Sequence, residues 1–173
     1  MAPELIRVLS KAEIRERVKT LGKSISEDYG DNRLVILGVL KGAFVFLADL
    51  IREIKIPFEV EFIQLASYGA DTQSSGEVKQ VKAFHIDLAD RDVLVVEDII
   101  DSGLTIAYLL ERLKQFRPKS IRVCALIDKR ARREVEVPLE YIGHTVHSGF
   151  LVGYGLDYNE SYRGLPEIYH LKQ

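Results

Sequence analysis

The chain has 173 residues and a mass of 19.6 kDa; 47% of the residues are hydrophobic and 29% are charged, which is typical of a globular protein with a substantial core. A formal net charge of -2 and a pI near 6.1 give no indication of a nucleic-acid or membrane partner. The single cysteine, Cys124, excludes an internal disulfide and a cysteine-rich metal site. Neither a signal-peptide pattern nor a membrane-length apolar run is present, so we expect a cytoplasmic protein.

The first third of the chain alternates between helical and strand periodicity. Ser10 followed by Glu13 fits a capping box, and the apolar residues after it recur on one helical face at Ile14, Val18, Leu21 and Ile25. The continuous apolar run 34–40 is typical of a strand that is covered on both sides. Residues 44–54 have helical spacing, and residues 58–68 alternate as a strand does.

The remaining elements follow the same order of strand, loop and helix. The polar stretch 69–76, GADTQSSG, predicts a mobile loop, and residues 81–86 predict a returning strand. Further segments are predicted as strands at 93–99, 121–127 and 141–147 and as a helix at 105–116, before an irregular C-terminal part. This order predicts an α/β fold with a mostly parallel, twisted sheet flanked by helices, built as one domain over residues 1–173.

Two adjacent carboxylates, Glu97 and Asp98, stand where one of the buried strands ends. Ligands of parallel sheets bind at the carboxyl ends of strands, so this position is informative. Like charges at such a place repel each other and resist desolvation, and a sequence optimised for stability alone would avoid them. A vicinal diol, or a magnesium ion bound to one, is a good use for the pair because hard cations prefer oxygen ligands.

The residues that follow the acidic pair lead directly into a predicted helix. They run from Asp101 through Ser102, Gly103 and Leu104 to Thr105. Backbone N–H groups, two hydroxyls and the positive end of a helix form a receptor for a phosphate dianion, and Gly103 allows close approach of the backbone. In the alternative interpretation, Asp101 or Ser102 is only the N-cap of the helix. That alternative leaves the acidic pair unexplained.

The segment VVEDIIDSGLT, residues 95–105, resembles the PRPP-binding motif of the type I phosphoribosyltransferases. Nearly the whole chain resembles the hypoxanthine-guanine phosphoribosyltransferases in particular, through the ordered segments LKGAFVFLADL, SYG with SSGEVK, EDIIDSGLT, LIDKR, FLVGYGLDYNE and YRGLPEI. The resemblance implies a small hood formed by about 1–10 and about 145–173. It also implies purine salvage, in which PRPP donates its phosphoribosyl group to hypoxanthine or guanine and IMP or GMP and pyrophosphate are formed.

The same resemblance implies how PRPP is held. The 5′-phosphate would lie in the loop 101–105, and Glu97 and Asp98 would hold the ribose hydroxyls. Asp101 would be the general base that takes the purine N7 proton as N9 attacks. The pyrophosphate contacts would come from Leu40, Lys41, Gly42 and Arg163. The alternatives are a simple strand-to-helix turn with Lys41 in solvent, and a surface charge at Arg163.

For the purine, the resemblance implies that Lys129 donates to the 6-oxo group and thereby selects against adenine. Phe150 would stack on the base, Leu151 would meet its edge through the backbone, and the pocket would be completed by Ile99, Leu156 and Asp157. The alternatives are core positions for Phe150 and Ile99 and a solvated basic surface at Lys129 and the arginines after it, Arg130, Arg132 and Arg133. Ser67 and Tyr68 resemble the start of a loop that closes over the site.

Magnesium is the implied cofactor, with Glu97, Asp98 and Asp157 as its ligands; in the alternative, Asp157 forms a turn. A homodimer or homotetramer that acts on small molecules is expected. Two rival functions are a same-fold transferase for another base, such as xanthine-guanine or pyrimidine, and a PRPP-sensing regulator of RNA or DNA. The first is disfavoured by Lys129, Phe150 and Leu156 with Asp157, and the net negative charge together with Asp101 argues against the second.

Overall fold

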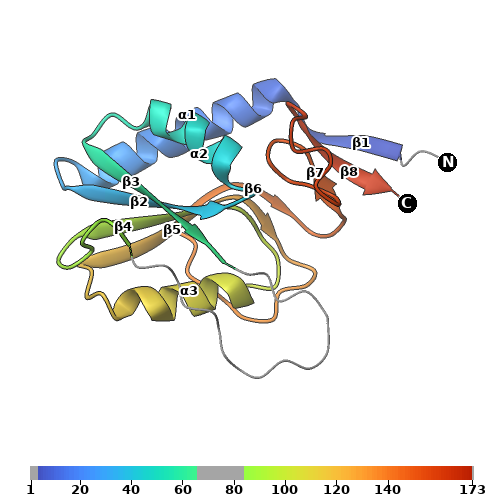
Figure 1. The fold of residues 1–173 in the computed structure, drawn as a ribbon. Helices are drawn as coiled ribbons and strands as arrows, with labels where there is room; N and C mark the ends of the chain where they lie inside the picture. The colour runs from blue at the N-terminus through green and yellow to red at the C-terminus, as the bar shows by residue number, and fades with distance from the viewer. Residues whose placement is uncertain (1–3, 66–83, 173) are drawn as a thin grey trace.

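The computed structural model describes residues 4–65 and 84–172. Its helices and strands, in chain order, are β1 (Glu4–Leu9), α1 (Lys11–Tyr29), β2 (Leu34–Leu40), α2 (Phe44–Glu53), β3 (Phe58–Gln64), β4 (Asp92–Ile100), α3 (Leu104–Lys114), β5 (Ser120–Lys129), β6 (Tyr141–Val146), β7 (Leu151–Val152) and β8 (Ile168–Lys172). They form a five-stranded sheet and a three-stranded sheet. Figure 1 shows α1 and α2 on one face of the larger sheet and α3 on the other.

The five-stranded sheet has the order β3-β2-β4-β5-β6, and all its neighbouring strands are parallel. Its central strands are continuous apolar runs because each face of the sheet is covered by a separate core. One core joins the sheet to α1 and α2, and the other joins it to α3. Cys124 lies in β5 as a free, buried thiol, as expected. The predicted α/β fold with a parallel sheet is confirmed.

Helix α1 begins as the sequence predicts. Ser10 is its N-cap, and the capping box with Glu13 is complete. The four apolar residues of the predicted face are all buried, and the helix ends at Gly30, whose φ of 56° suits glycine. No helix within residues 4–65 and 84–172 is both long enough and apolar enough to cross a membrane.

The three-stranded sheet, β1-β8-β7, joins the two ends of the chain and is called the terminal sheet below. Its strands are antiparallel, with Glu4 opposite Lys172 and Leu151 opposite His170. The sequence predicts an irregular C-terminal part, and this prediction is wrong where β7 and β8 form. β7 and β8 are short, and their pairing partners lie far away in the sequence, so local alternation does not identify them. Figure 1 shows this sheet beside the end of the molecule toward which β2 points.

The segment before β4 also differs from its prediction. Strand β3 ends at Gln64, short of residue 68, and residues 84–86 are not a strand, while residues 66–83, with the predicted loop, lie outside the described part. Residues 84–86 are held by side chains instead. Phe84 meets Phe116 edge to face at 5.1 Å between ring centroids, and the His85 N–H donates to Glu61 Oε2 at 2.8 Å. The apolar spacing of Phe84 and Ile86 therefore reflects anchoring to the core, not strand pairing.

Candidate active site

The predicted site residues from the first 129 positions that the structure describes gather at the carboxyl ends of three neighbouring strands. β4 lies between β2 and β5, with Gly38 opposite Val96 and Ile100 opposite Asp128. In this register, Asp101 follows β4 beside Lys129, the last residue of β5. Lys41 directly follows β2. Parallel pairing therefore brings together residues that are up to 88 positions apart in sequence (129 minus 41).

The acidic pair is buried, with Glu97 and Asp98 each 8% exposed. The Asp98 N–H donates to Glu97 Oε1 at 3.0 Å, and the Ile99 N–H donates to Asp98 Oδ1 at 2.8 Å. Burial raises the pKa of the Glu97 carboxyl well above its usual range, and the charge of Asp98 raises it further; burial also raises the pKa of Asp98. Neither carboxylate forms an ion pair with another described residue. The pair therefore suits a cation or a hydroxyl-bearing ligand.

Two glycines allow three segments to approach one another at the acidic pair. A Cβ on Gly42 would lie 1.8 Å from Asp98 Oδ2, and a Cβ on Gly155 would lie 2.3 Å from the Gly42 carbonyl oxygen. Gly155 also has a φ of 99°, which other residues rarely adopt. The peptide bond between Leu40 and Lys41 is cis. The loop after β2 is thus enclosed between Asp98 and the C-terminal segment.

The loop 101–105 enters α3 through Gly103, which is the N-cap residue with a φ of 85°. A Cβ there would lie 2.2 Å from the Val135 carbonyl oxygen, so only glycine fits. The N-cap itself makes no side-chain capping bond, and within the described residues the Ser102 hydroxyl accepts a local bond from the Leu104 N–H at 3.3 Å. The alternative in which Asp101 or Ser102 is the N-cap is therefore wrong. The first amides of a helix have no intrahelical partner, and Leu104 and Thr105 are exposed.

Arg133 holds this loop against β5, a role that the sequence interpretation missed. Its Nε donates to the Asp101 carbonyl oxygen at 2.9 Å, and its NH2 group reaches Asp128 Oδ1 at 2.5 Å. The Arg133 side chain is 5% exposed, so the solvated basic surface is wrong for this residue, whereas Arg132 is 75% exposed. The signal was Asp128, which follows an apolar run at the end of a predicted strand and, being fully buried, requires a cation.

Lys129 and Asp101 form a direct pair. Lys129 Nζ lies 3.0 Å from Asp101 Oδ2, and the side chains are 9% and 30% exposed. Lys129 is therefore not part of a solvated surface. The other carboxylate oxygen, Asp101 Oδ1, is buried and has no hydrogen-bond partner among the described residues. A buried acceptor without a partner is available to a proton donor on a ligand.

The residues predicted to contact the purine differ in exposure. Phe150 is 49% exposed and meets Tyr158 edge to face at 5.4 Å, so its interpretation as a core residue is wrong. Leu151 and Leu156 are buried. Ile99 is partly buried and packs against the core, as its alternative interpretation expects. Ser67 and Tyr68 lie outside the described residues.

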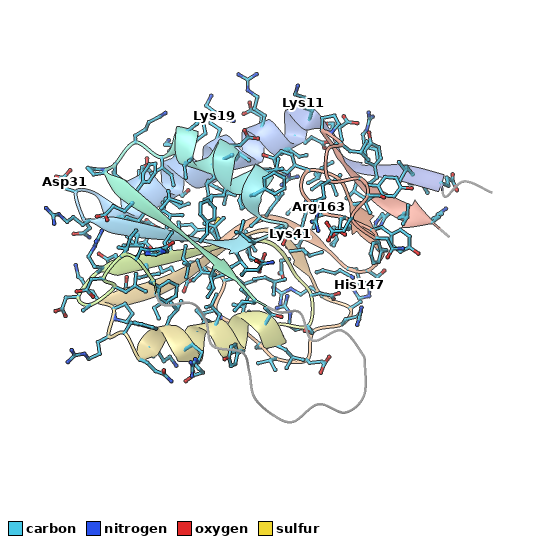
Figure 2. All side chains as sticks on the ribbon, in the orientation of Figure 1. Lys11, Lys19, Asp31, Lys41, His147 and Arg163 are labelled. Atoms are coloured by element: carbon cyan, nitrogen blue, oxygen red, sulfur yellow. The ribbon has the colours of Figure 1, made fainter. Side chains whose placement is uncertain are left out.

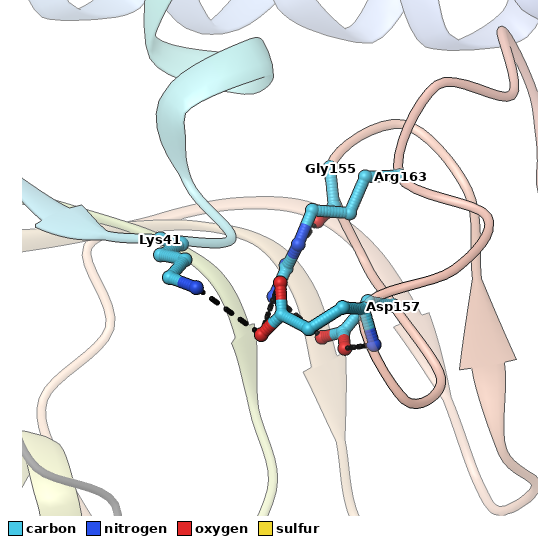
Figure 3. A network of polar contacts seen from close by, with 5 residues as sticks. Lys41, Gly155, Asp157 and Arg163 are labelled. Carbon is cyan, nitrogen blue, oxygen red and sulfur yellow. Dashed lines mark hydrogen bonds and ion pairs between the residues drawn. The ribbon is translucent and has the colours of Figure 1, made fainter.

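A second polar network includes Lys41, just before Gly42, and Arg163 from the C-terminal segment (Figures 2 and 3). Arg163 NH1 donates to the Gly155 carbonyl oxygen at 2.8 Å, and NH2 lies 2.9 Å from Asp157 Oδ1. Lys41 Nζ lies 3.2 Å from Glu160 Oε1. Arg163 is only 20% exposed, so it is not a surface charge. Asp157 does form a turn, because its Oδ2 accepts from the Glu160 N–H at 2.9 Å.

No group of three or more His, Cys, Asp and Glu side chains that could hold a metal ion occurs in the parts of the chain that the structure describes. Two buried, uncompensated carboxylates nevertheless fit a hard cation, since Mg²⁺ commonly binds one or two carboxylates together with substrate phosphates and water. The residues present thus match the donor chemistry of magnesium at Glu97 and Asp98. Asp157 is already bound to Arg163 and to a backbone amide.

Comparison with known proteins agrees with this geometry. Residues 7–159 match the phosphoribosyl transferase domain family. The chain is 44% identical to hypoxanthine phosphoribosyltransferase of Salmonella typhimurium over 93% of this chain and 92% of that protein. It is 45% identical to hypoxanthine-guanine phosphoribosyltransferase of Bacillus subtilis, over 95% and 92% of the two chains. A crystal structure of a hypoxanthine-guanine phosphoribosyltransferase from Bacillus anthracis superposes with a TM-score of 0.88 and 40% identity, covering 97% of this chain and 99% of that one. The chain therefore belongs to the phosphoribosyltransferase family, in its hypoxanthine(-guanine) branch.

Proposed function

We propose that this phosphoribosyltransferase joins hypoxanthine, and also guanine, to the ribose 5-phosphate of PRPP and releases pyrophosphate, a reaction of purine salvage. The observation that carries the proposal is the buried acidic pair followed directly by a glycine-entered helix start at the end of β4. The first suits the ribose hydroxyls and the second suits a phosphate, and only a few residues of one chain segment separate the two. The relatives named above carry the same activity in their names.

PRPP would be bound at both ends. The loop 101–105 receives the 5′-phosphate, Glu97 and Asp98 accept from the ribose hydroxyls, and the pyrophosphate lies against Leu40–Gly42 and Arg163. The close packing of Gly42 on Asp98 supports this arrangement, because it sets the pyrophosphate loop beside the acidic pair. Magnesium held by Glu97 and Asp98, with Asp157 as a further ligand, would neutralise charge on the pyrophosphate.

Asp101 would accept the N7 proton while N9 attacks the ribose C1′. The carboxylate is suited to this because one of its oxygens is buried without a partner in the described part of the chain and the other contacts Lys129. The 6-oxo group and N7 are neighbours on one edge of the purine, so a lysine donor beside a carboxylate acceptor matches the two atoms in order. Adenine presents a 6-amino donor to the same lysine and is disfavoured.

The purine would lie between this edge contact and the terminal sheet. Phe150 is exposed and free to stack on a base, Leu151 offers its backbone, and the pocket would be completed by Ile99, Leu156 and Asp157. The terminal sheet would form the hood of a single domain. Ser67 and Tyr68 as the start of a closing loop stay a prediction, as does the cytoplasmic location.

We also propose self-association as a dimer or tetramer. Phe44 at the start of α2 and Phe62 on the edge strand β3 are 46% and 49% exposed. Large apolar side chains on a sheet edge and its covering helix are suited to burial against a second copy. Light scattering over a range of concentrations measures the state, and a monomer throughout would contradict this proposal.

The activity is tested by incubating the purified protein with PRPP and magnesium and offering hypoxanthine, guanine, xanthine, adenine and uracil separately. We expect pyrophosphate release with hypoxanthine and guanine and little with adenine or uracil. Chelation of magnesium should abolish the turnover, and excess magnesium should restore it. If no base leads to pyrophosphate release, the enzyme assignment is wrong. If full activity remains under chelation, the reaction does not require magnesium.

A further inference from the structure

Glu160 contacts both cations to which we assign the pyrophosphate. Its Oε1 lies 3.2 Å from Lys41 Nζ and 3.5 Å from Arg163 NH2. Figure 3 draws dashed contacts from the labelled Lys41 and Arg163, and the printed distances identify Glu160 Oε1 as an acceptor of both. Lys41 follows β2, whereas Glu160 and Arg163 belong to the segment between β7 and β8. One carboxylate thus connects two distant parts of the site.

The Glu160 side chain is not needed for the shape of its own turn. The Glu160 backbone N–H donates to Asp157 Oδ2, and Tyr158 and Ser161 exchange backbone hydrogen bonds around it at 3.1 and 2.9 Å. The carboxylate itself is 66% exposed. A substitution that keeps the backbone therefore leaves these contacts intact, and the role of the carboxylate lies in its contact with the two cations.

The electrostatics favour an ionised carboxylate at this place. The hydrogen bond from Lys41 and the charges of Lys41 and Arg163 lower the pKa of Glu160 below its usual value. A pyrophosphate oxygen and a carboxylate oxygen use the same donors on lysine and arginine. Two anions on the same two cations repel each other and share their donors, so a pyrophosphate bound at Lys41 and Arg163 competes with Glu160 for these contacts.

We propose that Glu160 is an internal competitor of pyrophosphate, which occupies Lys41 and Arg163 when the substrate is away and weakens the binding of both PRPP and the product pyrophosphate. The inference rests on the proposed function, because it assumes that these two cations contact the pyrophosphate. Exposed ion pairs are weak, so the effect is small enough for a substrate to overcome and lies at about two- to fivefold in affinity. Its consequence is easier release of pyrophosphate at the cost of weaker PRPP binding.

Glu160→Gln tests the competition, since it removes the charge and keeps the size of the side chain. We expect the KM for PRPP and the inhibition constant of pyrophosphate to fall together, by about two- to fivefold, with the KM for hypoxanthine unchanged. Glu27→Gln is the matched control. Glu27 is 65% exposed and pairs with Lys23 on α1, remote from the site, and this variant should behave as the parent protein. Unchanged or raised constants in Glu160→Gln would overturn the inference.

Lys41→Met separates this inference from the proposed function. If Lys41 contacts pyrophosphate, this variant raises the KM for PRPP, and the effect of Glu160→Gln becomes smaller when both changes are combined. A Lys41→Met variant with the parent KM for PRPP and the parent pyrophosphate inhibition would defeat the pyrophosphate assignment itself. Two outcomes would leave the pyrophosphate assignment intact and defeat only the role of Glu160 as a competitor. In the first, Lys41→Met raises the KM for PRPP and Glu160→Gln has no effect. In the second, the effect of Glu160→Gln is as large in the double variant as it is alone.

Discussion

Two lysine–carboxylate pairs at the edge of the same sheet have similar lengths and different surroundings. Lys129 and Asp101 lie 3.0 Å apart with side chains 9% and 30% exposed, and Lys41 and Glu160 lie 3.2 Å apart with side chains 55% and 66% exposed. In the first pair, desolvation makes an uncompensated charge expensive. In the second, water replaces a lost partner at little cost. Distance alone therefore does not tell how firmly a pair is held.

The two pairs also differ in the segments that carry them. The buried pair joins the ends of adjacent strands, and Arg133 binds both of the segments that carry it. The exposed pair joins a loop after β2 to a turn in the C-terminal segment, without strand pairing between them. We expect the pair of Lys129 and Asp101 to keep its geometry and the more exposed pair of Lys41 and Glu160 to exchange partners readily.

The largest expected effect comes from Asp101→Asn in the buried pair. Removal of the proton acceptor should lower turnover about 10²- to 10⁴-fold, while PRPP binding, measured by calorimetry, is retained. Asp31→Asn, in the exposed turn before β2, is the control and should leave the rate unchanged. An Asp101→Asn variant that turns over at the parent rate would show that Asp101 is not the base.

Arg133→Met tests whether the buried arrangement depends on its buried guanidinium. Among the residues that the structure describes, the change leaves Asp128 with Arg130 as its remaining ion-pair partner. It also removes the bond to the Asp101 carbonyl oxygen, so we expect the free energy of unfolding to fall by about 3 kcal/mol. Urea denaturation measures it. Arg132→Met, at a neighbouring position that is largely exposed, should change stability by less than about 0.5 kcal/mol. If both variants change the free energy of unfolding equally, Arg133 does not stabilise the buried arrangement.

The smallest expected effect is on the pH dependence of stability, and it concerns the acidic pair. The pKa of Glu97 is raised in the folded protein, so the folded state binds its proton more tightly than the unfolded chain does. Its contribution to stability is complete below the usual pKa of 4.5 and is lost as the pH rises through the raised pKa. Denaturation between pH 4 and 8, without metal, should show a shallower decline in Glu97→Gln than in the parent protein. An identical decline would show that Glu97 ionises freely.

Much of the site was predictable because its residues lie in one segment, the last part of β4 and the loop after it. Glu97, Asp98 and the loop 101–105 are contiguous, so a single segment already contains the acidic pair and the helix start. Arg133 was missed because its neighbours Arg130 and Arg132 are exposed, and only the burial of Asp128 distinguishes it from them. Glu160 was missed because nothing near it in the sequence indicates that Lys41 is its partner.

The sequence by itself determined the alternation of helices and strands in the parallel sheet, the capping box of α1 and the acidic segment at the end of β4. These features depend on side-chain periodicity and turn chemistry within a few residues, which a single segment contains. The tertiary structure alone decided the terminal sheet, the contact of Lys129 with Asp101, the burial of Arg133 and the convergence of Lys41 and Arg163 on Glu160. Each of these needs partners that are distant in sequence, and such partners are chosen by the packing of the whole chain.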